Sequence, residues 1–580
     1  MSDFTITQEQ MVANIQKLQT WMQGQGLDAF YISSSNIYLD EYTPLEDCHR
    51  YYFTRFTGST ADVLVPLTGK VIIFVDGRYH EQAEQECNAQ YVQVFKCPQN
   101  GAPRVSLEKV LQESFAGKTL GLEGDRTPSS FEQALAKIVT LKCYDHQELA
   151  AVLDFAPLSC AKEIFPLDKK FISKTTAQKL NLAVQADEAF FVTASDTIAW
   201  LTNCRGFQTP CQSQFLAKAL ATRDTLYVMA GGGIKVGAAA QALPNIKWVD
   251  DLAKVLPTIA ATTVYYDPNG VSGADERLLQ NVFSSKLQAK AGGLTMLHSV
   301  KDAAELVQVR AGFRKSDQAI YQALTWVIDA VKQAAKKKRG KVSEKEFQEK
   351  VDASFRAHTA LDQSFTTIAA AGKHSSIIHY MAADPKTYLK AGDFLLLDCG
   401  GLFPEGFCTD TTRTIALPGK APSKKQKLLY TLVLKGMLRA SMAVFTKDTR
   451  GSDIDALARS VIMPAGFNYN HGTGHGVGIA VHEPGIRFSS ASNTIIQEGQ
   501  VVSIEPGIYL PGFGGVRIEN IVEVIKHPKY KDMLCFRPLV YIGMFPGLIE
   551  KSMLTSDEKL YLRAYEKECQ KRGTSFGLKV

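Results

Sequence analysis

The stretch FLLLDCG at residues 394–400 is followed, after the turn LFPEGF, by CTDTTRTIAL at residues 408–417. The four apolar residues before Asp398 predict a buried strand, and the second segment predicts a Thr-rich strand that carries Asp410. A turn with Pro and Gly between two strands predicts a hairpin, in which the two aspartates can approach each other. One Asp at a strand end can simply cap a turn, but two buried carboxylates repel and must be neutralised.

A second acidic hairpin is predicted for VVSIEPGIYLPGFGGVRIENIVEV, residues 501–524, with Gly-Phe-Gly-Gly as its turn. Glu505 lies in the first strand, which should end at the following Pro-Gly, and Glu519 lies in the second. An ion pair with Arg517 could account for either glutamate alone, but not for four carboxylates on two hairpins. Four acids balance the charge of two divalent cations, and oxygen ligands with one imidazole suit Mn²⁺, Co²⁺ or Zn²⁺.

Two cysteines, Cys399 and Cys408, lie beside the acidic positions and could be metal ligands instead. Packing is the favoured interpretation, because thiolates would imply a softer metal site than the carboxylates do.

A glycine-rich segment, HGTGHGVG at residues 471–478, carries His471 and His475 four positions apart. This spacing is typical of two metal ligands on one helix face. However, each glycine inside a helix costs roughly 1 kcal/mol, so the segment is predicted to be a loop.

An internal repeat precedes these motifs. DAFYISSSNIYL begins at Asp28 and EAFFVTASDTIAWL begins at Glu188, and both predict a strand followed by a helix start. Each is then followed by a predicted pair of strands, so we expect two related α/β domains, near 1–158 and 159–296, with coincidence as the alternative. A long amphipathic helix is predicted from Lys301 onward.

The lysine run KKKRGKVSEKEF follows this helix. Its lysines could bind nucleic acid, but Ser343 and Glu346 predict a capping box that opens the next helix, which favours a solvated turn.

The composition is that of an ordinary globular protein, with 45% hydrophobic and 21% charged residues over 580 positions. The net charge of +6 gives no electrostatic footprint for nucleic acid. The first residues lack the pattern of a signal peptide, and no apolar run is long enough to cross a bilayer. Eleven dispersed cysteines without a C-x-x-C pair indicate a reducing compartment. We therefore expect a cytoplasmic protein with no nucleic-acid or membrane partner.

Together the motifs IIHY, LLLDCG, TDTTRT, HGTGHGVG, VHEPG, SIEPG and GVRIEN, in this chain order, resemble the pita-bread metallopeptidases, and more closely the Xaa-Pro aminopeptidases. The resemblance spans the whole chain, with FTGSTADVLV, VDGRY and DTIAWLTNCRG matching further upstream. It implies the three-domain, cytosolic type of fold, of mixed α/β and α+β class. Two creatinase-like α/β domains, 1–158 and 159–296, would precede a pita-bread catalytic domain, 297–580.

The resemblance also implies roles for single residues. Five positions match the family's metal ligands, with Asp410 and Glu519 as the bridging pair: Asp398, Asp410, His475, Glu505 and Glu519. His379 and His482 match the two histidines that contact the substrate and the developing oxyanion. His471 matches a histidine near the site that does not bind metal, and Arg517 matches an arginine that braces the carboxylates. Asp398 and Asp410 are twelve positions apart, one more than is usual in the family, and the LFPEGF turn can absorb the extra residue.

The implied reaction is hydrolysis of the bond before a proline in the second position of a peptide. Two cations about 3.5–4 Å apart can share a water and make hydroxide near neutral pH. Glu505 would move the proton toward the leaving nitrogen, while His379 and His482 would stabilise the oxyanion. The resemblance implies two divalent ions, with Mn²⁺ favoured over Zn²⁺ or Co²⁺, peptide substrates and a homodimer.

The alternatives are other enzymes with the same fold and, from another functional class, a binding protein. A prolidase, which cleaves Xaa-Pro dipeptides, is the nearest, and the doubled N-terminal region argues against it. Methionine aminopeptidase is disfavoured by the same extension, and creatinase-type chemistry without metal is disfavoured by the intact ligand set. A catalytically inactive pita-bread binding protein is disfavoured because such proteins have typically lost ligands.

Overall fold

The computed structural model describes residues 4–98, 102–156, 162–337 and 340–580. The chain divides into two compact units, one formed by Met1–Asp168 with Lys174–His298, and the other by Lys169–Ser173 with Ser299–Val580. Within the described ranges, no helix is both long and apolar enough to pass through a bilayer.

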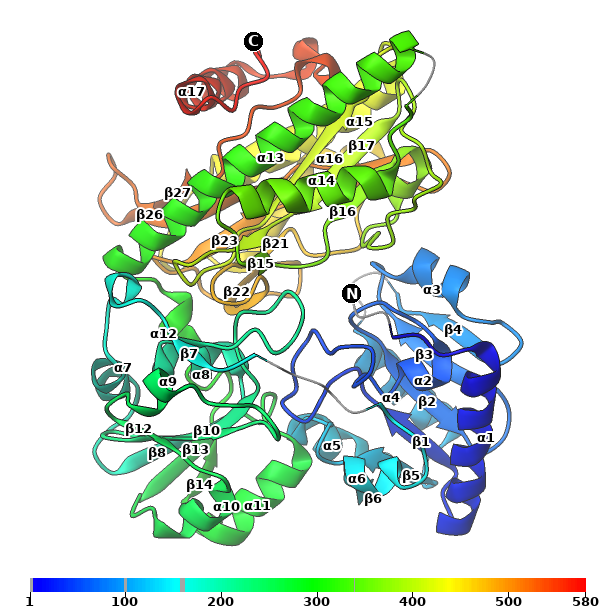
Figure 1. The fold of residues 1–580 in the computed structure, drawn as a ribbon, viewed down its shortest axis with the longest axis vertical. Coiled ribbons are helices and arrows are strands. Elements are labelled where there is room, and N and C mark those ends of the chain that lie inside the picture. The colour runs from blue at the N-terminus through cyan, green and yellow to red at the C-terminus, as the bar shows by residue number, and fades with distance from the viewer. Residues whose placement is uncertain (1–3, 99–101, 157–161, 338–339) are drawn as a thin grey trace. The chain divides into compact units, whose positions relative to one another are not determined.

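The first unit begins with a six-stranded sheet of order β4-β3-β2-β1-β5-β6 (Figure 1). Its strands are β1 (Ala29–Ile32), β2 (Asp62–Pro66), β3 (Val71–Val75), β4 (Val92–Lys96), β5 (Thr119–Glu123) and β6 (Thr140–Tyr144). The pair of strands predicted after the first copy of the repeat is confirmed, because β2 and β3 pair antiparallel as a hairpin. Helices include α1 (Gln8–Gln25), α3 (His80–Glu86), α4 (Pro103–Ser114), α5 (Ser129–Leu135) and α6 (His146–Ala150). The apolar side chains of β1 are fully buried because the sheet is covered on both faces.

A second sheet repeats this topology, with the order β12-β11-β10-β8-β13-β14. Its strands are β8 (Glu188–Val192), β10 (Ala217–Thr222), β11 (Leu226–Ala230), β12 (Ile246–Trp248), β13 (Thr263–Tyr266) and β14 (Leu287–Ala289). In both sheets the first strand pairs antiparallel with the next and parallel with the fifth. The internal repeat predicted from the sequence is therefore confirmed in strand order and direction. The boundaries near 158 and 296 stay a prediction.

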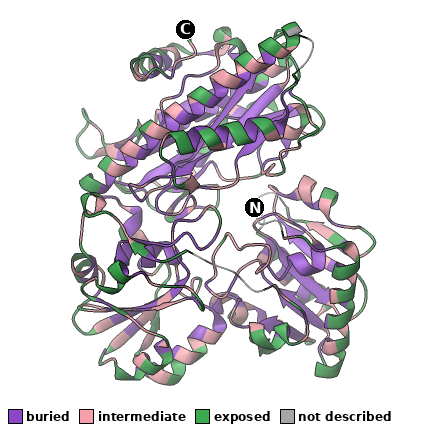
Figure 2. Ribbon diagram, in the orientation of Figure 1, coloured by how far each residue is buried: buried purple, intermediate pink, exposed green. Residues whose placement is uncertain are grey.

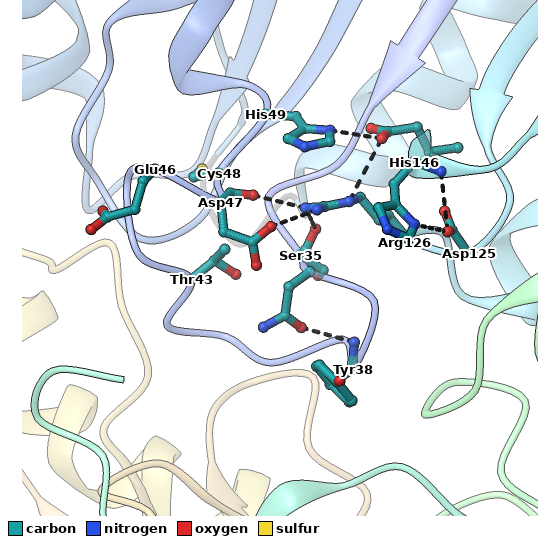
Figure 3. A network of polar contacts seen from close by, with 12 residues as sticks. Ser35, Tyr38, Thr43, Glu46, Asp47, Cys48, His49, Asp125, Arg126 and His146 are labelled. Atoms are coloured by element: carbon teal, nitrogen blue, oxygen red, sulfur yellow. Dashed lines mark hydrogen bonds and ion pairs between the residues drawn. The ribbon is translucent and has the colours of Figure 1, made fainter. Parts of the chain in front are cut away.

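A buried polar network fastens the loop after β1 to the ends of β5 and β6 (Figure 3). The Arg126 guanidinium, whose side chain is 4% exposed, donates to the Asp47 carboxylate at 2.5 Å and to the Asp47 carbonyl oxygen at 2.7 Å. Nearby, His49 Nδ1 lies 2.7 Å from Glu123 Oε1. Because Arg126 and Glu123 are almost inaccessible to water, their charges depend on their neighbours for compensation.

The second unit packs long helices on antiparallel sheets. Its six-stranded sheet has the order β20-β27-β26-β23-β21-β22, and a three-stranded sheet β16-β17-β19 and the ladder β24-β25 complete the strands named here. Their bounds are β16 (Ile368–Ala371), β17 (Phe394–Cys399), β19 (Thr411–Ala416), β20 (Val444–Thr446), β21 (Gly474–Gly476), β22 (Glu483–Phe488), β23 (Val501–Ile504), β24 (Gly507–Leu510), β25 (Gly514–Arg517), β26 (Asn520–Lys526) and β27 (Met533–Pro538). The main helices are α13 (Ala303–Lys337), α14 (Glu344–Ala357), α15 (Lys424–Ser441), α16 (Gly451–Ile462) and α17 (Ser556–Arg572). Strands of the unit are largely buried, whereas α13 and α14 alternate buried and exposed residues (Figure 2). This alternation is the amphipathic pattern predicted for α13.

The predicted capping box is confirmed for one of its two bonds, since the Ser343 hydroxyl accepts from the Glu346 amide at the start of α14. Residues 338 and 339 of the preceding lysine run lie outside the described residues.

Candidate metal centre

The first acidic hairpin forms as predicted. Strands β17 (Phe394–Cys399) and β19 (Thr411–Ala416) pair antiparallel, with Asp398 opposite Thr412. Asp410 was predicted within the second strand, but it immediately precedes β19. Every residue of both strands is buried, and the two aspartates are buried with them.

The second acidic hairpin is split into two ladders. Strands β23 (Val501–Ile504) and β26 (Asn520–Lys526) pair up to Ile504 opposite Asn520. Strands β24 (Gly507–Leu510) and β25 (Gly514–Arg517) then resume the pairing at Gly507 opposite Arg517. The predicted strand end at Pro-Gly is confirmed, and Glu505 and Glu519 lie in the gap between the ladders.

The glutamates of this gap bond to other segments of the unit. The Glu519 amide donates to the Thr412 carbonyl oxygen at 3.1 Å, and the Glu505 amide donates to the Thr473 carbonyl oxygen at 2.8 Å. The interrupted hairpin thereby connects the first hairpin to the glycine-rich segment, which brings acids from distant parts of the chain together.

The glycine-rich segment is not a helix, as predicted, but it is not entirely a loop. Gly474–Gly476 form β21, which pairs with β22 (Glu483–Phe488) and β23, and the register shifts at His475. A Cβ on Gly474 would lie 1.9 Å from the Ser503 carbonyl oxygen. Glycine is needed here for the close approach of two backbones.

His475 points its Nε2 at the carboxylates. Its Nδ1 donates to the Gly476 carbonyl oxygen at 3.0 Å, because a carbonyl can only accept. Nε2 lies 3.2 Å from Glu505 Oε1 and 3.5 Å from Asp410 Oδ2. A backbone contact that fixes the far ring nitrogen is typical of metal-ligating histidines.

The donor set fits divalent cations. Ligand atoms of Asp410, His475 and Glu519 lie within 4.8 Å of one another. Asp398 Oδ1 and Glu519 Oε1 are buried and have no hydrogen-bond partner among the described residues. Hard oxygens with one imidazole suit Mn²⁺, Zn²⁺ or Co²⁺ in a catalytic site.

The pKa values of these acids also favour a site for cations. Burial, with Glu519, Asp398 and Glu505 nearby, raises the pKa of Asp410 well above its usual range. Burial, with Glu505 and Asp398 nearby, raises the pKa of Glu519 to about 8. Burial also opposes the charge of Glu505, but the hydrogen bond and the charge of His475, together with His471 and Arg517, outweigh it and lower the pKa of Glu505 to about 2. His475 thus compensates Glu505, whereas Asp410 and Glu519 need further positive charge.

Arg517 holds Asp398 rather than either glutamate. Its Nη2 donates to Asp398 Oδ2 at 2.5 Å, and its Nε donates to the Thr412 hydroxyl at 3.1 Å. Nη1 donates to the Tyr509 hydroxyl at 2.8 Å. The alternative pairing of Arg517 with Glu505 or Glu519 is therefore not the one observed.

His471 lies beside the carboxylate group instead of within it. Its Nδ1 donates to the Gly472 carbonyl oxygen at 2.7 Å, so Nε2 accepts from the Tyr509 hydroxyl at 2.9 Å. Burial lowers the pKa of His471 to about 4, which keeps the imidazole neutral. Arg459 on α16 donates to its carbonyl oxygen at 2.8 Å and so anchors the segment.

The two histidines with expected substrate roles lie on different segments. His482 stacks edge-on against His475, with ring centroids 4.3 Å apart. His379 is half-buried in the turn after η4 (Gly372–Ser376). The Gly515 amide of β25 donates to the Ser375 hydroxyl at 2.8 Å, so the same ladder that ends at Arg517 supports the segment before His379.

Sequence reasoning missed three residues that organise the site: Thr412, Ser503 and Tyr509. The Thr412 hydroxyl donates to Glu519 Oε2 at 2.9 Å, and the Ser503 hydroxyl accepts from the His475 amide at 2.9 Å. A signal was present for Ser503, because alternation along the first predicted strand puts positions 503 and 505 on one face. Tyr509 lies in β24, beyond the interruption at Pro506, so alternation does not relate it to Glu505. For Thr412, its pairing opposite Asp398 depended on a register that the sequence leaves open.

Cys399 and Cys408 are both buried. The Cys408 thiol donates to the Ile479 carbonyl oxygen at 2.9 Å. Burial, together with Asp398, raises the pKa of Cys399 well above its usual range, so it stays a neutral thiol. These facts agree with packing roles.

Comparison with known proteins gives the family. The sequence pattern of metallopeptidase family M24 matches residues 311–526, and two creatinase/prolidase N-terminal patterns match residues 14–155 and 156–305. A probable Xaa-Pro aminopeptidase P of Neurospora crassa is 30% identical over 602 residues, covering 96% of this chain and 85% of the relative. The chain belongs to the Xaa-Pro aminopeptidase P family.

A second relative and a solved structure also match this chain over nearly its full length. The Xaa-Pro aminopeptidase P relative from Pyricularia oryzae is 29% identical and covers 95% of this chain and 94% of its own. The crystal structure of X-prolyl aminopeptidase from Caenorhabditis elegans matches with a TM-score of 0.87 at 22% identity, over 98% of this chain and 96% of that one. The predicted fold is confirmed, with creatinase N-terminal domains followed by an M24 catalytic domain. As a member of this family of Xaa-Pro aminopeptidases, the chain is a metallopeptidase enzyme.

Proposed function

We propose that this chain hydrolyses the first peptide bond of peptides with proline in the second position, with two divalent metal ions as cofactors. The observation that carries the proposal is the buried group of Asp410, His475 and Glu519, whose ligand atoms face one another. The names of the relatives support the same reaction.

Five residues would hold the cations: Asp398, Asp410, His475, Glu505 and Glu519. The two unpartnered carboxylate oxygens support this set. When bound, the cations lower the pKa of a shared water enough to supply hydroxide near neutral pH. The C. elegans neighbour is described as having a di-nuclear active site. We propose Mn²⁺, although Zn²⁺ and Co²⁺ accept the same ligands.

The remaining residues would act on the substrate and its protons. Glu505 would accept a proton from the attacking water and pass it to the leaving nitrogen. His379 and His482 would donate hydrogen bonds to the substrate carbonyl oxygen as negative charge grows there. His471 would lie on the substrate side of the glycine-rich segment, and Arg517 would keep Asp398 in place by the 2.5 Å contact.

Specificity for proline poses a particular demand. The nitrogen that leaves is a tertiary amide nitrogen without a hydrogen, so the site must accept the ring. The prolidase alternative shares this demand but requires a dipeptide. Hydrolysis of an Xaa-Pro-Yaa tripeptide and an Xaa-Pro dipeptide, assayed side by side, separates the two functions. We expect faster turnover of the tripeptide.

The metal requirement is tested by removing the ions with a chelator and adding back Mn²⁺, Zn²⁺ or Co²⁺ one at a time. We expect no hydrolysis of Xaa-Pro-Yaa without metal and full recovery with Mn²⁺. Failure of every cation to give turnover, with the protein folded, would favour the binding-protein alternative.

Three further features belong to the same proposal. We propose a homodimer, a cytoplasmic location, and domain limits at 1–158, 159–296 and 297–580. The C. elegans neighbour is described as a cytosolic enzyme, which supports the second.

A further inference from the structure

A buried glutamate that is not among the proposed metal ligands bonds to the segment that carries His379. Glu344 is the first residue of α14, directly after the Ser343 cap, and its side chain is fully buried. Neither the cap nor the metal centre uses this carboxylate. A buried carboxylate is expensive unless several donors satisfy it, so its partners identify what it stabilises.

The partners of Glu344 come from one stretch of chain. Oε1 accepts from the Ala371 amide at 2.7 Å and lies 3.0 Å from His374 Nδ1. Oε2 accepts from the Tyr380 hydroxyl at 2.7 Å and from the Asp384 amide at 3.3 Å. These donors lie on both sides of His379 in the sequence, so one side chain ties both ends of its turn to α14.

The rings around the carboxylate make this arrangement rigid. His374 and Tyr380 lie with ring centroids 4.7 Å apart, and both contact Glu344. On the other side, a Cβ on Gly515 would come within 2.1 Å of the Ser375 carbonyl oxygen, so η4 fits closely against β25. The stretch before His379 is thus held between α14 and the ladder that ends at Arg517.

We infer that Glu344 is a positioning residue, which sets the orientation of the His379 turn and thereby of the imidazole that contacts the substrate. The inference rests on the proposed role of His379. Tyr380, the neighbour of His379 in the chain, is the most direct connection, because its hydroxyl bonds to the carboxylate. A group that must meet a developing charge needs its geometry fixed in advance, which this carboxylate provides.

The test compares Glu344→Gln with Glu346→Gln, a matched change at an exposed position in the first turn of the same helix. In Glu344→Gln an amide NH₂ replaces one acceptor oxygen, so some of the four donors lose their partner. We expect kcat/KM for an Xaa-Pro-Yaa peptide to fall about tenfold or more, mainly through kcat, with metal content unchanged. Glu346→Gln should keep wild-type activity. Tyr380→Phe, which removes one contact and no charge, should give a smaller loss in the same parameter.

A double-mutant cycle separates positioning from general stability. If Glu344 acts through His379, Glu344→Gln should add little to the loss already caused by His379→Ala. Multiplied losses in the double variant, or wild-type kcat in a folded Glu344→Gln, would overturn the inference. Wild-type activity in His379→Ala would instead overturn the proposed role of His379, so the two failures are distinguishable.

Discussion

Glu505 and Glu519 face each other across an interruption in a single hairpin, between the pairs Ile504–Asn520 and Gly507–Arg517. Neither residue belongs to the paired part of the hairpin. The Glu505 amide instead donates to the Thr473 carbonyl oxygen, and the Glu519 amide donates to the Thr412 carbonyl oxygen. Both carboxylates are consequently directed toward residues from the other hairpin and the glycine-rich segment. The interruption therefore brings the acidic residues of the two hairpins together in one group.

Removal of one member of this group should abolish metal binding. Asp410→Ala or His475→Ala is expected to eliminate both metal content and hydrolysis, because the remaining ligands no longer balance or enclose the cations. The two N-terminal sheets share no ligand with the site, so their folding should persist. Metal analysis, peptide assay and circular dichroism measure the three quantities. Normal metal content with normal turnover in either variant would contradict the assignment.

Tyr509→Phe tests one of the three residues that sequence reasoning missed. Its hydroxyl accepts from Arg517 and donates to His471, so its loss leaves two buried polar groups without a partner. We expect a loss of stability of about 1–3 kcal/mol and a lower kcat with retained metal. Tyr530→Phe, at an exposed tyrosine, is the control and should change neither quantity.

Much of this site could be predicted because the proposed ligands lie within short sequence patterns that indicate hairpins. Apolar runs that end in an acid, and turns rich in Pro and Gly, specify hairpins within about twenty residues of sequence. The interruption at Glu505 was also visible, since Pro506 cannot donate to a ladder. Both hairpins are confirmed by the observed pairings.

What could not be predicted depends on contacts between distant segments. β21 forms because the backbones of Ser503 and Glu483 pack against Gly474 and Gly476. The β-propensity of a Gly-His-Gly segment does not by itself predict a strand. Arg517 pairs with Asp398, 119 positions away, rather than with the acids near it in sequence. Glu344 likewise meets partners that only the fold brings to it.

Gly474→Ala should damage the site through sterics alone. The added Cβ would come within 1.9 Å of the Ser503 carbonyl oxygen, in a strand that cannot shift without moving His475. We expect weakened metal binding and a lower melting temperature. Gly24→Ala is the matched control, since its Cβ meets nothing within 4 Å and it lies in helix α1. That change should be neutral or stabilise by up to about 1 kcal/mol.

Arg126→Met should destabilise the first unit through the network of Figure 3. The change leaves Asp47 and Glu123 without their guanidinium in a buried setting, which costs about 3–5 kcal/mol. Lys118→Met breaks only an exposed contact with Asp28 and should cost less than about 1 kcal/mol. Thermal melts of the two variants provide the comparison, and equal melting temperatures would show that the network contributes little.

Asp317→Asn should stabilise the protein, and only at higher pH. Burial raises the pKa of Asp317 to about 7, while the Tyr541 amide donates to one oxygen at 2.9 Å. The other oxygen has no hydrogen-bond partner among the residues that the structure describes. Because the folded pKa exceeds the unfolded value of about 3.9, the folded state binds the proton more tightly. Stability from this group is therefore present below about pH 4 and is lost as the pH rises to about 7.

The asparagine is neutral at every pH and keeps an oxygen for the Tyr541 amide. At pH 8 the free energy of unfolding should rise by on the order of a few kcal/mol, and near pH 4 it should be unchanged. Asp329→Asn, at an exposed position of the same helix, should shift it by less than about 0.5 kcal/mol at both pH values. Denaturant titrations at the two pH values measure the difference. No gain at pH 8, or a loss, would mean that Asp317 is ionised in the folded state and that Arg413 and Arg572 nearby compensate its charge.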